Sequence, residues 1–366
     1  MRLEKLSVRD WRNFALGSLE LEGKVTVLCG QNGEGKSNLL EAVYMLVGFR
    51  SFRTSAMSEL VRWGAASARI AGVLVVGGVE RKLEVELSPG KRRSSMDGKS
   101  VRRDSAALTG ASVVVFSPED LQLASGPATE RRRELDRAVF AVYRPYYREA
   151  SDFERALRSR NSVLRRGESR GELLDSYDET LAELGARIVV RRRGVVKALE
   201  RDFSQTFSEI NGGSAAMSYR SEREVEEAKD EAEIRSALQA RLLAGRERDM
   251  ARGFTGSGPQ RDDLEIKLGE RLAREHGSQG QLRALVLALK LAELRYASQG
   301  NGEAPLLLLD DVASELDEER RGRLFGAIAS TSCQTLITVT EREHLPELAG
   351  RVDFVVKAGQ VRRVEE

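Results

Sequence analysis

The sequence predicts an α/β protein in which a mixed sheet, built from both ends of the chain, is split by a helical insertion. Short apolar runs alternate with helical patterns near both termini, which is typical of strands joined by helices. From about residue 119 apolar residues instead recur every three or four positions, as in amphipathic helices. We therefore predict one lobe from residues 1–117 and 300–366, and a helical lobe from residues 118–299.

The first lobe begins with β-rich sequence around one helix. Apolar runs between glycine-containing turns predict strands at Leu19–Leu21, Val25–Cys29, Arg69–Val76, Val79–Leu87 and Ser112–Phe116. Gly77 and Gly78 lie between two of these runs and predict a hairpin. The helix follows the second strand, and one of its faces is apolar: Leu39, Leu40, Val43, Leu46 and Val47.

The insertion contains two long helical patterns. Apolar spacing from Leu174 to Ile210 predicts one amphipathic helix of unusual length, with a break near Gly185 or Gly194 left open. A second, highly charged helix is predicted over Glu222–Ala251, after the connection NGGSAAMSYR. The pair predicts a short antiparallel helical arm.

The remaining sequence returns to strand patterns. DLEIKLGERLAR predicts a short hairpin, and the run APLLLLDD predicts a buried parallel strand. A helix over Asp317–Ala329 leads to another strand, QTLITVT. The chain then closes with RVDFVVKAGQVRRV, a hairpin that turns at KAGQ.

Composition excludes several classes of protein. Charged residues make up 32% of the 366 residues and aromatic residues 5%, and no apolar run approaches the roughly 18 residues of a membrane span. Two cysteines and two histidines are too few for a disulfide framework or a histidine-based metal centre. The amino terminus lacks an apolar signal segment. We expect a cytoplasmic protein without membrane contact.

Clusters of basic residues suggest a partner with a phosphate backbone, although the net charge is only +2. Most such clusters in proteins are solvated surface. Five in one chain favour a nucleic-acid footprint instead. They are Lys91–Arg93, Arg102–Arg103, Arg131–Arg133, Arg165–Arg166 and Arg191–Arg193.

A complete phosphate-loop motif, G-x-x-x-x-G-K-[ST], occurs at residues 30–37, after a predicted strand and at the start of a helix. Its glycines free backbone N–H groups to surround phosphates, and the helix dipole adds partial positive charge. Lys36 is predicted to bridge the β- and γ-phosphates, and Ser37 to bind Mg²⁺. The residues assigned to this loop are Gly30, Gln31, Asn32, Gly33, Glu34, Gly35, Lys36 and Ser37.

The strand APLLLLDD supplies the expected partner of this loop. Asp310 lies where an apolar strand ends, and is predicted to bind the water shell of Mg²⁺. Asp311 follows it and is predicted to polarise the attacking water. An apolar run that ends in Asp-Asp is also compatible with a simple helix cap, so the assignment depends on Lys36.

A second loop, HGSQGQ, also precedes an apolar helix but has no lysine. In NTPases whose heads pair face to face, the lysine loop of one subunit and a serine–glycine loop of the other hold one ATP. We therefore predict that Ser278, Gly280 and Gln281 contact the γ-phosphate of a partner subunit. The alternative is an ordinary glycine-containing helix start.

These motifs resemble the ATPase heads of the ABC/SMC class, and in detail the RecF family of bacterial recombination-repair proteins. The resemblance covers essentially the whole chain. It is carried by DWRNF (10–14), GQNGEGKSNLLEAVYMLVGFRSFR (30–53), VVVFSPEDLQL (113–123), ERRRELD (130–136), GPQRDDL (258–264), GSQGQ (277–281) and LLLLDDVASELD (306–317). It adds Arg12, Asn13 and Asn38 to the expected nucleotide contacts.

The resemblance implies an α/β P-loop ABC-type ATPase head, with a mixed sheet and an inserted helical lobe that bears a short antiparallel arm. It also implies a weak, DNA-dependent ATPase that forms an ATP-dependent homodimer with Mg²⁺ and binds double-stranded and gapped DNA. Such proteins act with RecO and RecR to load RecA onto single strands coated by SSB. Hydrolysis then releases the dimer.

Two positions depart from the usual patterns. Gln260 stands where the family usually has His, which leaves the roles of Arg261 and Asp262 open. Asp311 stands where the wider ABC class has Glu, and its shorter side chain predicts slow hydrolysis. The Q-loop equivalent is either Glu119 or Gln122.

Two other functions remain compatible with the phosphate loop. An ATPase subunit of a membrane transporter would share the three motifs, but the arginine clusters and the long arm argue against it. A small-molecule kinase would share the phosphate loop and would leave GSQGQ unexplained.

Overall fold

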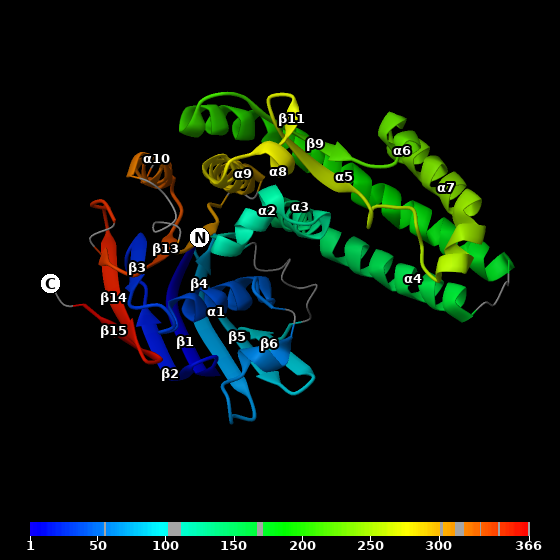
Figure 1. Cartoon of the computed structure of the whole chain (residues 1–366). Helices are drawn as coiled ribbons and strands as arrows, with labels where there is room; N and C mark the ends of the chain where they lie inside the picture. Colours follow the sequence, from blue (N-terminus) through cyan, green and yellow to red (C-terminus); the bar gives the residue numbers. More distant parts are fainter. Residues whose placement is uncertain are drawn as a thin grey trace. The chain divides into compact units, whose positions relative to one another are not determined.

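The computed structural model describes residues 1–54, 56–101, 111–166, 171–300, 303–311, 318–329, 331–342 and 345–364. The chain divides into two compact units, and strands from both ends of the chain meet in the first (Figure 1). Unit 1 comprises Met1–Asp120 and Lys290–Glu366, and unit 2 comprises Leu121–Leu289. These units are bounded at 120/121 and 289/290, and the lobe boundaries at 117/118 and 299/300 stay a prediction.

Unit 1 contains a six-stranded mixed sheet in the order β15-β14-β3-β13-β12-β8. Five of its strands are parallel, and the edge strand β15 pairs antiparallel with β14. β12 and β13 are buried at every position, which explains their unbroken apolar sequence. The strands are β3 (Val25–Cys29), β8 (Val113–Phe116), β12 (Leu306–Asp310), β13 (Thr335–Val339), β14 (Arg351–Lys357) and β15 (Gln360–Arg363).

The second sheet of unit 1 is antiparallel, in the order β2-β1-β4-β5-β6-β7. The predicted hairpin at Gly77–Gly78 is confirmed, since β4 and β5 pair up to Val76 and Val79. The long first strand β1 and the strands β6 and β7 were not predicted. The strands are β1 (Arg2–Trp11), β2 (Phe14–Glu20), β4 (Ala68–Val76), β5 (Val79–Ser88), β6 (Lys91–Met96) and β7 (Lys99–Ser100).

Helix α1 (Lys36–Gly48) packs between these two sheets. It contacts β1, β4 and β5 on one side and β8, β12 and β13 on the other. Every residue from Leu39 to Val47 is buried, so the helix is apolar nearly all round. Unit 1 also contains the short helices η1 (Met57–Leu60) and η3 (Pro118–Asp120), the helix α10 (Glu318–Ala329) and the end of α9 (Gln279–Gly300).

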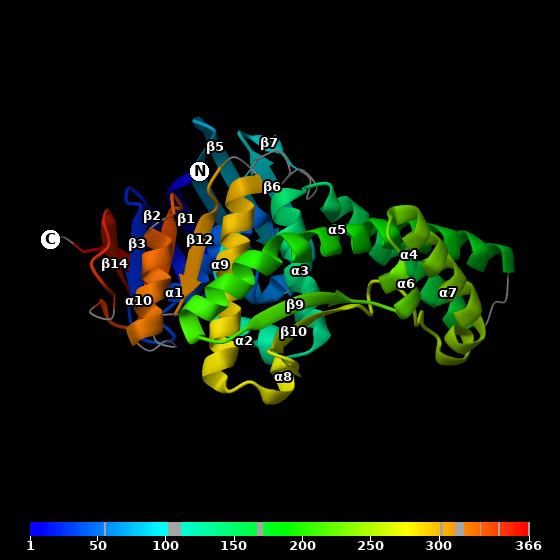
Figure 2. The same ribbon diagram turned by 90° about the horizontal axis from the view of Figure 1, so that it is seen from above.

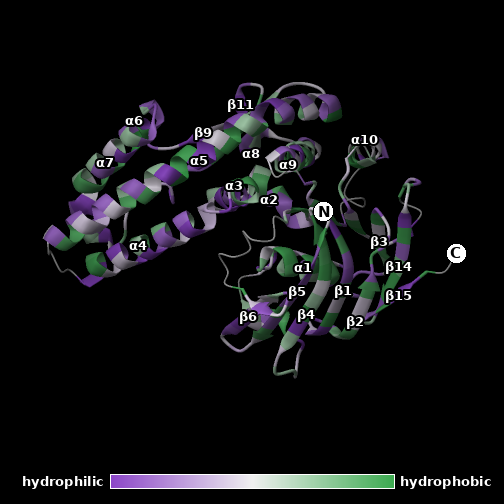
Figure 3. Cartoon of the chain, turned by 180° about the vertical axis from the view of Figure 1, so that it is seen from behind, coloured by the Kyte–Doolittle hydropathy of each residue, from purple (hydrophilic) through white to green (hydrophobic). Residues whose placement is uncertain are grey.

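Unit 2 is mainly helical. Helices α4 (Tyr146–Arg166), α5 (Gly171–Asn211) and α7 (Glu231–Arg252) lie side by side (Figures 1 and 2). Hydrophobic and hydrophilic residues alternate along them, as expected of amphipathic helices (Figure 3). The unit also contains α2 (Leu121–Ser125), α3 (Ala128–Val142), α6 (Arg223–Glu227), α8 (Ala273–His276) and a sheet of β9 (Ala215–Arg220), β10 (Asp263–Leu268) and β11 (Arg271–Leu272).

The helical arm differs from the prediction in three respects. Helix α5 runs unbroken through Gly185 and Gly194. The predicted helix Glu222–Ala251 is wrong as one element, because α6 ends before Asp230 caps the separate helix α7. The connection between the arm helices contains β9, which pairs antiparallel with β10. Among the described residues, no helix has both the length and the apolar character needed to cross a membrane.

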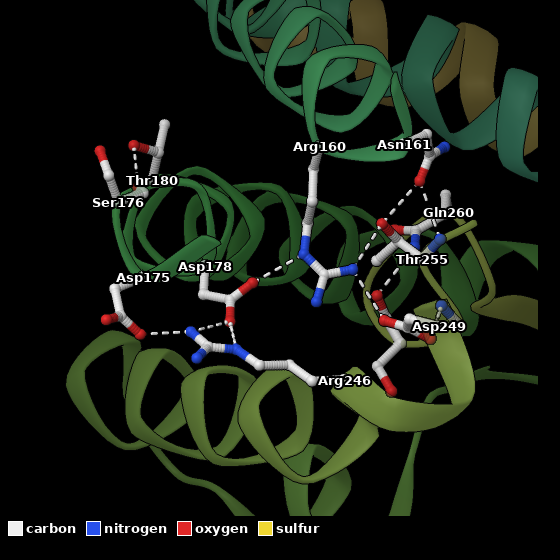
Figure 4. A network of polar contacts seen from close by, with 12 residues as sticks. Arg160, Asn161, Asp175, Ser176, Asp178, Thr180, Arg246, Asp249, Thr255 and Gln260 are labelled. Atoms are coloured by element: carbon white, nitrogen blue, oxygen red, sulfur yellow. Dashed lines mark hydrogen bonds and ion pairs between the residues drawn. The ribbon is translucent and has the colours of Figure 1, made fainter. Parts of the chain in front are cut away.

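A buried network of charges joins the helices of unit 2 (Figure 4). Arg160 of α4 is fully buried and donates to Asp178 of α5 and Asp249 of α7, at 2.7 Å in each case. Arg160 also donates to the Thr255 hydroxyl at 2.9 Å, and Arg246 donates to Asp178 at 2.8 Å. Burial of these charges is tolerable because each one is paired.

We predict that Asp249→Ala lowers the free energy of unfolding by about 3 kcal/mol, because it leaves a buried guanidinium without one of its carboxylates. Urea denaturation followed by circular dichroism measures this. The control is Arg158→Ala, since Arg158 is 70% exposed and pairs with Glu154 on the same helix. That change should stay within about 0.5 kcal/mol. Equal losses in the two variants would contradict a structural role for the network.

Candidate nucleotide-binding site

The phosphate loop connects β3 to α1, as the motif requires. Gly35 has φ 112°, and a Cβ at this position would come within 2.6 Å of the Asn13 side chain. A Cβ at Gly30 would come within 2.2 Å of the Val356 carbonyl oxygen. Only glycine fits these two positions, so the motif's spacing is a consequence of the loop's geometry.

Lys36 turns back over the loop. Its Nζ donates to the carbonyl oxygens of Gly30 at 2.6 Å and Gln31 at 3.0 Å, and the residue is only 6% exposed. An ammonium held in this way lies inside the curve of the loop, where the phosphates of a nucleotide would also lie.

Asp310 meets the phosphate loop at the carboxyl edge of the parallel strands. The Ser37 hydroxyl donates to Asp310 Oδ1 at 2.7 Å, and the Thr338 hydroxyl donates to the same oxygen at 2.8 Å. Burial raises the pKa of Asp310, and the two hydroxyl donors oppose that rise. The structure thus joins the two residues predicted to bind Mg²⁺. Thr338, on the strand between them, was not predicted.

Asp311 also lies at this edge. Its φ is 52°, and its backbone N–H donates to Thr338 Oγ1 at 2.8 Å. A pocket of about 240 Å³ lies above the loop, and Asp311 lines it together with Asn32, Gly33, Gly35, Lys36, Ser37, Asn38 and Arg53. Residues 312–317, which complete the motif LLLLDDVASELD, lie outside the described residues.

Asn13 contacts the phosphate loop, and Arg12 contacts the helix α1 that follows the loop. Arg12 makes two 2.8 Å hydrogen bonds to Glu41, a fully buried residue of α1. Asn13 Nδ2 donates to the Glu34 carbonyl oxygen at 2.8 Å, and Asn13 Oδ1 accepts from Asn38 at 2.9 Å. These contacts position the loop. Direct contact of Arg12 and Asn13 with a nucleotide stays a prediction.

Two further residues near the pocket were missed. Arg53 donates to Asn38 Oδ1 at 2.9 Å and lines the pocket, although its motif GFRSFR was assigned no role. Glu41 accepts from Arg12 and from the Ser51 hydroxyl. An acidic residue within an otherwise apolar helix was the signal that could have identified Glu41 as a paired, buried charge.

The second predicted loop forms the start of α9 in unit 2. Ser278 is exposed, its N–H donates to Gln281 Oε1 at 2.9 Å, and its Oγ accepts from the Gln281 N–H at 3.3 Å. This reciprocal pair is a capping box. Gly280 lies in the first turn of the helix. The geometry is that of a capped helix start that faces solvent, and contact with a partner's nucleotide stays a prediction.

Only some side chains of the arginine clusters are exposed at the protein surface. Arg131 is 4% exposed and makes two hydrogen bonds to Asp263, at 2.7 and 2.9 Å. Arg192 is 6% exposed and bonds to Asp136 and the Pro259 carbonyl oxygen. The prediction that these two residues belong to a nucleic-acid footprint is therefore wrong. Arg102–Arg103 lie outside the described residues.

Comparisons with known proteins match this chain to one family over nearly its whole length. The family model described as RecF/RecN/SMC N terminal domain matches residues 2–362. The DNA replication and repair protein RecF of Myxococcus xanthus (strain DK1622) is 42% identical over 346 residues, which cover 93% of this chain and 91% of the relative. Its counterpart from Geobacter sulfurreducens is 36% identical over 343 residues, 93% of each chain.

Solved structures confirm the fold. A structure of the recombination mediator protein RecF with ATPrS, in the RecFOR pathway, has a TM-score of 0.91 and 32% identity, and the match covers 100% of this chain and 98% of that one. An SMC head bound to a domain of ScpA has a TM-score of 0.56 at 17% identity, which shows the fold alone. The chain therefore belongs to the RecF family of DNA replication and repair proteins.

Proposed function

We propose that this chain binds ATP at the loop of Lys36, dimerises through its heads, and in that form binds DNA during recombinational gap repair. The observation that carries the proposal is the direct contact between Ser37 and Asp310, residues from opposite ends of the chain, beside a pocket lined by Lys36. A structure of a family member with ATP, 32% identical to this chain, supports the choice of nucleotide.

The residues present fit Mg²⁺. The Ser37 hydroxyl and the Asp310 carboxylate are hard oxygen ligands, and they already lie 2.7 Å apart. They would hold the ion directly or through water, and the ion would neutralise charge on the phosphates. Lys36 supplies a second positive charge, and the N–H groups of the glycine-rich loop orient the phosphates.

Asp311 is the proposed group that positions the attacking water. It lines the pocket, and its backbone is fixed by Thr338. Because its carboxylate reaches one methylene less than the glutamate of the wider ABC class, hydrolysis should be slow. A slow ATPase suits a timer that releases the protein from DNA.

The proposed dimer completes each ATP site with Ser278, Gly280 and Gln281 of the other subunit. Ser278 is exposed at the amino end of α9, where the helix dipole favours an anion. We further propose that double-stranded and gapped DNA stimulates hydrolysis. The protein would act with RecO and RecR, so that RecA is loaded onto strands coated by SSB.

We predict that Lys36→Met weakens ATP binding about 10- to 100-fold, since it removes one charge-assisted contact to the phosphates. Fluorescence titration with a labelled ATP analogue measures the affinity. Lys91→Met removes the same charge from an exposed strand position and should leave the affinity unchanged. Wild-type ATP hydrolysis by the Lys36→Met protein would show that the site is misassigned.

Ser278→Arg should leave ATP binding by the monomer intact, because Lys36, Ser37 and Asp310 are unchanged. It should prevent ATP-dependent dimerisation, because a bulky side chain replaces the hydroxyl expected at the partner's γ-phosphate. Light scattering with ATP and Mg²⁺ measures the dimer. Ser236→Arg, at an exposed serine of α7, is the control and should dimerise normally. A Ser278→Arg protein that still dimerises would reduce GSQGQ to a helix start.

Mixed dimers provide an independent test of the composite site. When Ser278→Arg chains are combined with Lys36→Met chains, one site in each mixed dimer carries both changes and the other carries neither. Part of the ATPase activity should therefore return on mixing, if one intact site suffices. A mixture that stays as inactive as either variant alone would argue against sites shared between subunits.

A further inference from the structure

Three exposed arginines and an exposed phenylalanine lie on adjoining chain segments of unit 2. Arg165 lies at the end of α4, Arg252 at the end of α7, and Phe254 and Arg261 in the loop that follows α7. They form one surface. The guanidinium carbon of Arg261 lies 5.1 Å from the centre of the Phe254 ring, and a Cβ placed on Gly253 would come within 3.1 Å of Arg165 Cγ. We call these four residues the arginine surface.

The arginines of this surface differ from most others in unit 2. Arg148, Arg155 and Arg158 of α4 are exposed too, but each pairs with an acidic residue on the same helix. Within the described part of the chain, Arg165, Arg252 and Arg261 make no side-chain hydrogen bond or ion pair. Favourable interaction with helix dipoles accounts for Arg165 and Arg252. It does not account for Arg261, which lies outside any helix.

The loop that carries Phe254 and Arg261 is held in one conformation by its neighbours. Asn161 accepts from both the N–H and the hydroxyl of Thr255, at 2.8 and 2.7 Å. The Gly256 N–H donates to Asp249 at 2.9 Å, which ties the loop to the buried charges of Figure 4. Further along, the loop accepts from Arg192 at Pro259 and from Arg132 at Asp262, and the Ser257 hydroxyl donates to Glu222.

Arg261 is therefore an exposed side chain on a loop whose backbone is held in place. Its guanidinium stacks on Phe254, which is 37% exposed. Stacking orders the planar group without consuming its hydrogen-bond donors. Little conformational entropy is then lost when a ligand binds. Arg261 therefore presents an ordered guanidinium, and two exposed arginines without an acidic partner among the described residues lie on neighbouring chain segments. Closely spaced positive groups of this kind are complementary to closely spaced anions.

We infer that the arginine surface binds the sugar-phosphate backbone of DNA, as a contact separate from the nucleotide site; this inference rests on the proposed function. Phosphates accept the paired hydrogen bonds that a guanidinium offers, and a DNA backbone presents them repeatedly. Contacts to phosphates carry no sequence information, so this contact positions DNA without selecting sequence. We assign DNA binding to this surface and not to Arg131 or Arg192, because the side chains of those two residues bond to carboxylates of the protein itself.

The test replaces Arg165, Arg252 and Arg261 together with Gln in the full chain. The matched control replaces Arg148, Arg155 and Arg158 with Gln, which changes the net charge equally in the same unit. Binding of a fluorescently labelled duplex is measured by anisotropy with an ATP analogue at several salt concentrations. Dimerisation by light scattering shows whether each variant keeps its ATP response.

We expect the triple variant to dimerise normally and to bind DNA about tenfold more weakly or worse. The slope of log K against log salt should become less negative by about three, because each lost phosphate contact removes roughly 0.9. The control variant should keep the wild-type slope. Equal slopes in the two variants would overturn the inference. So would a triple variant that retains DNA binding but loses binding to poly-glutamate, because the surface would then suit an acidic protein.

The outcome for wild-type protein separates this inference from the proposed function. A wild-type chain that fails to bind DNA with an ATP analogue contradicts the proposed function itself. A wild-type chain that binds, with a triple variant equal to the control, contradicts only the role of the arginine surface.

Discussion

The burial of α1 between two sheets is the constraint on which the nucleotide site depends. Packing on both sides fixes the helix's position, and with it Lys36 and Ser37 at its first turn. The same burial encloses Glu41, whose charge must then be paired. Arg12 and Ser51 supply the partners, so the segments before and after the helix are drawn against it. The burial of α1 therefore contributes both to the stability of unit 1 and to the geometry of the nucleotide site.

Much of unit 1 could be predicted because its signals are local. The phosphate loop, the run of four leucines and the two hairpins each have a sequence pattern that only a few backbone conformations satisfy. Thr338 and Glu41 have no such pattern. Their roles arise from which strand lies between β3 and β12 and which turn covers α1, and both depend on tertiary packing. The strand β9 was missed for the same reason, since its partner β10 lies far along the chain.

The arginine clusters show where composition misleads. Successive residues on an α-helix point about 100° apart, so three consecutive arginines cannot share one face. On α3, Arg131 faces inward to Asp263 while Arg133 is 63% exposed and pairs with Glu130. Similarly, Gly185 marks close packing rather than a break, because a Cβ there would lie 3.1 Å from Leu238. In both cases the sequence gives the residue type, but it does not show which neighbouring residues that position will face in the folded protein.

The capping box at Ser278 bears on how the proposed composite site would work. The hydroxyl that is expected to meet a phosphate already accepts a long, 3.3 Å hydrogen bond from the Gln281 N–H. A hydroxyl has one donor and two acceptor positions, so this bond leaves the Ser278 O–H free to donate to a γ-phosphate. The cap and the proposed phosphate contact are therefore compatible, and the N–H groups at the start of the helix point toward the same anion. The cap would then hold the loop in a helical conformation while no partner is present, so that dimerisation requires little rearrangement.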